Sequence, residues 1–143
     1  MILVLVAPER SIKSVMVNKR KPQSIHNLNE KKAIKLIAEA LKTDNIESQK
    51  TFDWLLGDKG TRLRVDGYFP SKNLVVEYHG AQHFLSNKLM DRRPGRAEQR
   101  RRYTELRKKL IPKHGLKLLE IRYDEPLTLE HISDRLRDEG YKI

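Results

Sequence analysis

The 143-residue sequence contains no cysteine, which excludes disulfide bonds and thiolate metal sites. It also has no apolar run long enough to cross a bilayer, and its opening residues, MILVLVAPER, are too short for a signal peptide and lack the basic flank of one. Aromatic residues make up only 6%, so we expect a modest core. The length of 143 residues suits a single domain. We therefore expect a cytoplasmic protein in a reducing setting, with no membrane partner.

Acidic residues are scarce beside basic ones, with 19 Asp and Glu against 30 Lys and Arg, and the formal net charge is +11. The excess is concentrated between residues 88 and 122, where thirteen basic residues face four acids. Such a field favours a polyanion, and nucleic acid is the first expectation. The alternative is an ordinary solvated helix face, and composition alone does not separate the two.

Hydrophobic periodicity predicts an alternating order of helices and strands. The predicted elements are a helix (27–42), three strands (48–56, 61–69 and 73–78), a helix (96–113), a strand (116–123) and a helix (128–140). Residues 1–26 are predicted to form an N-terminal hairpin or arm with a basic linker, and residues 27–143 the folded domain. In the last helix we expect Thr128 as N-cap, with Leu129, Ile132 and Leu136 facing inward.

Two acids lie in the later part of neighbouring predicted strands. Asp66 lies late on one strand and Glu77 late on the next, and alternation puts His79 on the face of Glu77. Two carboxylates brought together repel each other unless a cation intervenes, and hard oxygen ligands suit Mg²⁺ or Mn²⁺. His79 or His83 can move a proton, because imidazole titrates near neutral pH. The residues therefore predict a metal site with a proton-transfer group.

Each of these residues also has an ordinary structural interpretation. Asp66 before a glycine could form a bend, Glu77 could be a surface acid, and the two histidines could lie in a turn or pack against the core. Glu30 continues the apolar stripe of the first helix toward the same region. It also has capping-box spacing from Asn27, and both roles stay open.

The stretch RVDGYFPSKNLVVEYHGAQHF resembles the core of the PD-(D/E)XK nuclease superfamily, in particular a small branch that includes very-short-patch-repair and phage-type homing endonucleases. The residues that match this pattern are Arg64, Asp66, Tyr68, Glu77, Gly80, Gln82 and His83. The helix around Glu30, the segment SQKTFDWL and the late segment GLKLLEIRYDE also resemble that branch. The resemblance spans roughly residues 27–125.

The resemblance implies an α/β fold with a restriction-endonuclease-like central mixed sheet flanked by helices, in the order αβββαβ. It implies a Mg²⁺- or Mn²⁺-dependent endonuclease that hydrolyses DNA, acts as a homodimer or in two visits, and works in the cytoplasm of a bacterium or a phage-infected cell. Asp66 and Glu77 would bind the metal, and Glu30 would support them. His79 and His83 would transfer protons, and Gln82 would orient water or a phosphate.

Two positions depart from the branch. His79 stands where the superfamily has lysine, and Thr104 stands where the second helix often has an acid three residues before a basic residue, which leaves the role of Arg107 open. The residues expected to neutralise DNA phosphates are Arg64, Arg92, Arg93, Arg96, Arg100, Arg101, Arg102, Arg107, Lys108 and Lys109.

Two other functions fit part of the pattern. RAP domains resemble the same core and would hold RNA without cleaving it. A structural nucleoid- or ribosome-associated protein explains the charge but not the acids. The set of carboxylates and histidines favours the nuclease, because a protein that only binds does not need it.

Overall fold

The computed structural model describes residues 24–81 and 94–143. These residues form an α/β structure with a four-stranded mixed sheet in the order β1-β2-β3-β4. The strands are β1 (Glu47–Leu56), β2 (Arg62–Phe69), β3 (Leu74–His79) and β4 (Lys117–Arg122). The first three form an antiparallel meander, and β4 pairs in parallel with β3.

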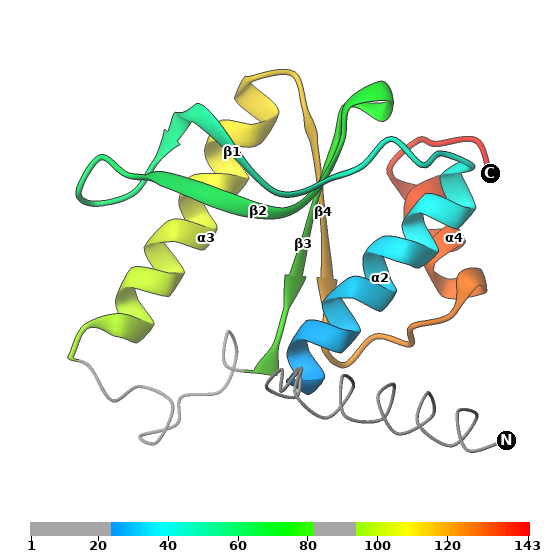
Figure 1. Cartoon of the computed structure of the whole chain (residues 1–143), viewed down its shortest axis with the longest axis horizontal. Coiled ribbons are helices and arrows are strands. Elements are labelled where there is room, and N and C mark those ends of the chain that lie inside the picture. Colours follow the sequence, from blue (N-terminus) through cyan, green and yellow to red (C-terminus); the bar gives the residue numbers. More distant parts are fainter. Residues whose placement is uncertain (1–23, 82–93) are drawn as a thin grey trace, which may run out of the picture.

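In the described part of the chain three helices flank the sheet: α2 (Ile25–Leu41), α3 (Arg96–Lys113) and α4 (Leu129–Asp138). A short 3₁₀ turn, η1 (Pro70–Lys72), joins β2 to β3. Helix α3 connects β3 to β4, as parallel pairing requires. In Figure 1, α3 lies along the β1–β2 pair, whereas α2 and α4 lie together beside β3 and β4. The order αβββαβ expected from the sequence is confirmed.

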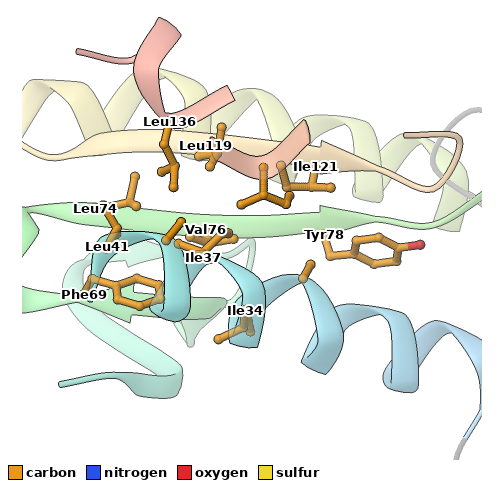
Figure 2. Packing of buried hydrophobic residues seen from close by; sticks show 13 residues of the cluster. Ile34, Ile37, Leu41, Phe69, Leu74, Val76, Tyr78, Leu119, Ile121 and Leu136 are labelled. Carbon is orange, nitrogen blue, oxygen red and sulfur yellow. The ribbon is translucent and has the colours of Figure 1, made fainter. Parts of the chain in front are cut away.

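The two faces of the sheet carry separate apolar clusters. The larger, which we call the α2 cluster, packs α2 and α4 onto the sheet, and its buried residues include Ile37, Phe69, Val76, Leu119 and Leu136 (Figure 2). The smaller, the α3 cluster, contains the buried residues Leu55, Leu63, Val65, Val75 and Ile111. Strand β3 is buried along its whole length because it contributes to both.

Most of the expected element ends are close to those observed. The predicted helix 96–113 coincides with α3, and Thr128 caps α4 by accepting the backbone N–H of His131. The inward position expected for Leu129 is wrong. Leu129 is 41% exposed, because it is the first residue of the helix and only Ile132 and Leu136 reach the core. The hairpin expected before residue 24 lies outside the described residues.

No helix in the described part of the chain is long and apolar enough to span a membrane.

Candidate active site

The sheet forks at Asp66 and Glu77. Strand β2 pairs with β3 only at its end, where Gly67, Tyr68 and Phe69 lie opposite Val76, Val75 and Leu74. The next step of that register places Asp66 opposite Glu77. Beyond it β2 continues with β1 while β3 continues with β4, and the two pairs run in different directions in Figure 1. Strand separation at this point makes room for side chains between the backbones.

Carboxylates take the place of the missing ladder bonds. The backbone N–H of Asp66 donates to Oε2 of Glu77 at 3.2 Å, and the backbone N–H of Tyr78 donates to Oδ2 of Asp66 at 2.7 Å. Each acid therefore accepts a backbone hydrogen bond from the opposite strand. This exchange fixes both carboxylates in the fork and satisfies the amides that the fork would otherwise leave unpaired.

The alternation of residues between the two faces of the sheet is also interrupted in β2 at this place. Val65 packs in the α3 cluster, whereas Gly67 faces Ile34 of α2, although residues two apart in a regular strand share a face. On the neighbouring strand Gln49 lies between the pairs Ser48–Gly67 and Lys50–Val65, so it is opposite Asp66. Gln49 has a left-handed backbone with φ of 53°. Asp66 is thereby positioned between the two sides of the sheet.

Helix α2 brings Glu30 to Asp66. The helix begins at Ile25 with Ser24 as N-cap, whose hydroxyl accepts the backbone N–H of Asn27. The capping-box role considered for Glu30 is therefore wrong, because Asn27 already lies inside the first turn. The Glu30 side chain is 14% exposed, lies 4.0 Å from His26 and accepts a 3.4 Å hydrogen bond from Nε2 of Gln49.

Burial raises the pKa of Glu30 from its ordinary 4.5 to about 8, and a hydrogen bond to Asp66 and the charge of Asp66 add to the shift. Burial likewise raises the pKa of Glu77 well above its usual range, followed by the charge of Asp66 and the hydrogen bond to it. Without a cation Glu30 therefore retains its proton near neutral pH, as expected of a carboxyl group crowded against another acid.

Arg107 of α3 closes the fork from the side of the α3 cluster. Its Nε lies 2.7 Å from Oε1 of Glu77, and its Nη2 donates to the carbonyl oxygen of Arg64 at 2.9 Å. The guanidinium thus ties the acid on β3 to the backbone of β2. Its charge lowers the pKa of Glu77 but does not outweigh burial. Arg107 points into the candidate site and not onto the exposed face of α3, where a phosphate contact was expected.

His79 and Glu120 form a second pair on the same side. Strand alternation places Glu77 and His79 on the α3 side, as expected, and both are buried, at 7% and 6% exposure. Nε2 of His79 lies 2.7 Å from Oε2 of Glu120 on β4. Arg135 of α4 donates to the carbonyl oxygen of Glu120 at 2.9 Å and holds this part of the strand. The imidazole is therefore oriented by a carboxylate.

Sequence reasoning missed Glu120 and Gln49. Glu120 had a signal, because it interrupts the apolar run of LKLLEIRY in the same way that Glu77 ends its own. Gln49 lies in the segment SQKTFDWL that resembles the nuclease branch, but nothing indicated its backbone, because glutamine carries no preference for the left-handed region. Of the expected site residues, Gln82 and His83 lie outside the described residues.

The basic residues of α3 divide into two groups. Arg100 and Arg107 are partly buried, whereas Arg101, Arg102, Lys108 and Lys109 are exposed. Arg102 forms a 2.6 Å ion pair with Asp58. Arg64 and Arg96 are also exposed, and Arg92 and Arg93 lie outside the described residues. The exposed group gives the outer face of α3 a positive charge.

Two further observations concern possible ligand sites. Within residues 24–81 and 94–143 no group of three or more His, Asp or Glu is arranged to hold a metal ion. A cavity of about 570 Å³ lies between the β1–β2 turn and α3, lined by residues that include Leu56, Tyr103 and Leu106. None of Glu30, Asp66 and Glu77 lines it, so the fork and this cavity are separate.

No protein-family profile matches the chain, and no solved structure matches it. A curated relative is "Uncharacterized protein 033L" of Invertebrate iridescent virus 3, which is 31% identical over 69 residues. The match covers 48% of this chain and 36% of the viral protein, so the matched segment spans about a third of that relative's length.

Proposed function

We propose that this protein is a divalent-metal-dependent endonuclease that hydrolyses phosphodiester bonds in DNA. The observation that carries the proposal is the pair of carboxylates fixed in the fork of the sheet, with Glu30 against Asp66 and Arg107 against Glu77. Burial, together with the neighbouring Asp66, raises the pKa values of Glu30 and Glu77, and carboxylates with pKa values shifted in this way cluster at functional sites.

The donor set fits a hard cation of the size of Mg²⁺ or Mn²⁺. Such ions are commonly held by one or two carboxylates, and they complete their coordination with water and substrate phosphate, so a cage of three protein ligands is not required. Asp66 and Glu77 would hold the ion, with Glu30 behind Asp66. When bound, the ion would supply Lewis acidity and a water of lowered pKa.

The neighbouring residues have the properties that the reaction needs. His79, oriented by Glu120, would accept or donate a proton. Arg107 would hold Glu77 in place and balance its charge. The exposed basic residues of α3 would bind the phosphates of the DNA backbone, which positions the polymer without reading its sequence. With one site in each chain, a double-strand cut would take a dimer or two visits.

The order of the elements supports a restriction-endonuclease-like fold. In that arrangement a helix precedes a three-stranded meander, and a second helix leads to a parallel fourth strand, which is the order found in this chain. Asp66 and Glu77, the metal ligands that the resemblance to PD-(D/E)XK nucleases implies, lie where the meander opens.

The test is nicking of supercoiled plasmid at pH 8 with 5–10 mM Mg²⁺ or about 1 mM Mn²⁺, concentrations on the order of those that fill weak carboxylate sites. We expect metal-dependent conversion to open circles that EDTA stops. Asp66→Asn, purified by the same procedure, controls for contaminating nucleases and should lose the activity. Equal nicking by wild type and Asp66→Asn, or none by either, would contradict the proposal.

A second function is favoured by one observation: the Arg107 guanidinium already neutralises Glu77 at 2.7 Å. A RAP-like module that binds RNA without cleaving it would keep such an ion pair permanently. The two functions differ in their response to metal. A pure binding module would bind RNA equally well in EDTA and in Mg²⁺, and would cleave neither RNA nor DNA.

A further inference from the structure

Gln49 is the residue of β1 whose backbone departs from a strand. Its φ of 53° falls in the left-handed region, which residues with a Cβ occupy rarely. Its neighbours Ser48 and Lys50 pair normally with Gly67 and Val65, so no residue is inserted and none is skipped. The conformation therefore does not arise from a bulge that shifts the register.

A strained backbone inside an ordered ladder persists when something specific holds it, and such residues cluster at functional sites. Glycine would adopt this conformation without cost, yet the position carries glutamine. The side chain therefore needs its own explanation.

The side chain of Gln49 reaches the acid cluster. Its Nε2 donates to Oε2 of Glu30 at 3.4 Å, and its backbone lies opposite Asp66. Glu30 in turn is hydrogen-bonded to Asp66. A neutral amide is suited to this place, because it donates to a carboxylate without adding a positive charge that would compete with a metal ion. The residue lies at the solvent-exposed edge of the cluster.

We propose that Gln49 is a positioning residue of the candidate site, which holds the Glu30 carboxylate beside Asp66 through its side-chain amide. The left-handed backbone at this point of β1 is the conformation that directs the amide to Glu30. The inference rests on the proposed function, because positioning matters if the acids bind a metal ion.

Three variants separate the amide from the backbone. Gln49→Gly removes the amide and relieves the backbone strain. Gln49→Met keeps the Cβ and the length of the side chain but removes the amide. Ser48→Gly is the matched control, because it introduces glycine one residue earlier, at a normally paired position. Thermal unfolding and Mn²⁺ affinity, measured by electron paramagnetic resonance of free Mn²⁺, are the readouts, and neither requires cleavage.

We expect Gln49→Gly to raise the melting temperature and to weaken Mn²⁺ binding by about 10-fold, at the low end of the loss typical for a partner that orients a ligand. Gln49→Met should weaken Mn²⁺ binding equally without the gain in stability. Ser48→Gly should lower the melting temperature and leave Mn²⁺ affinity unchanged.

Wild-type affinity in either Gln49 variant would overturn the role of the amide, and a lower melting temperature for Gln49→Gly would overturn the argument from strain. Absence of Mn²⁺ binding by the wild type would overturn the proposed function and this inference with it. That result is distinguishable from the first two, in which the wild type binds.

Discussion

Arg107 and Glu77 form a largely buried ion pair, with Nε of Arg107 2.7 Å from Oε1 of Glu77. The pair joins α3 to the fork of the sheet and brings a positive charge against the acid cluster. Removal of the Arg107 guanidinium leaves Glu77 facing Asp66 with no positive charge beside it. The stability of the fork therefore depends on a residue that also adjusts the charge of the candidate site.

Arg107→Met should lower the stability of the protein by about 2–4 kcal/mol at pH 8, since breaking one side of a buried pair leaves the other charge uncompensated. The variant should recover part of that loss when Glu77→Gln is added, because the double variant contains no unpaired buried charge. Urea unfolding of the two single variants and the double variant measures the coupling. Strictly additive effects would contradict the ion pair.

The metal-free protein should lose stability as the pH rises from about 4.5 to about 8. Glu30 holds its proton more tightly in the folded than in the unfolded state, so its contribution is fully present below pH 4.5 and is lost as the pH passes about 8. The raised pKa of Glu77 acts in the same direction. Because water reaches part of Glu30, we expect a loss of about 1–2 kcal/mol, or roughly 3–8 °C in melting temperature.

Glu30→Gln is the control for this pH dependence, because an uncharged amide replaces the protonated acid. Melting temperatures between pH 4.5 and pH 9 in EDTA should fall less for this variant than for the wild type. A wild-type profile that rises over the same range would show that Glu30 is not held in its protonated form.

His79→Ala should slow DNA cleavage by about 10²–10⁴-fold, the range typical for loss of a general acid or base. Glu120→Gln should have a smaller effect, roughly 10-fold, because it leaves the imidazole in place but removes the carboxylate that orients it. Single-turnover rates at saturating Mg²⁺ measure both. If Glu120→Gln slowed cleavage as much as His79→Ala, Glu120 would take part in the chemistry itself. If neither variant slowed cleavage, both residues would be structural.

The exposed face of α3 should account for the salt dependence of DNA binding. Replacing Arg101 and Lys109 by alanine removes two exposed charges and should reduce the slope of log K against log salt by about 2. The same change at Lys31 and Lys32, on the exposed face of α2, should leave the slope unaltered. Equal effects from the two pairs would mean that the net charge, and not the α3 face, binds DNA.

The sequence predicted most of the fold, because its elements carry local signals. The predicted helix 96–113 coincides with α3, and apolar periodicity correctly placed Ile132 and Leu136 of α4 in the core. The direction of Arg107 had no such signal. An arginine among other arginines on a helix resembles a solvated residue, and its partner Glu77 lies on a strand that only tertiary packing brings near.

The candidate site was likewise predictable only in part: its acids could be identified from the sequence, but their contacts could not. Asp66 and Glu77 could be found because each is an acid in an apolar strand. The antiparallel hairpin then places residues that are equally far from its turn opposite each other. The reciprocal bonds between their carboxylates and the opposing backbone could not, because they depend on where β2 leaves β3. Gln49 is the extreme case, since its position follows from a backbone conformation that its residue type does not favour.

The central claim is that the two acids in the fork hold a divalent cation, and a Mn²⁺ titration tests it most directly. Electron paramagnetic resonance of free Mn²⁺ at pH 8 should reveal at least one site in the wild-type protein that Mg²⁺ displaces. Asp66→Asn and Glu77→Gln should each weaken that site by at least about 10-fold. Asp66→Asn, which leaves the Arg107–Glu77 pair intact, should keep a melting temperature at or above the wild-type value. Mn²⁺ binding that is the same in the wild type and both variants, or absent from all three, would contradict the account.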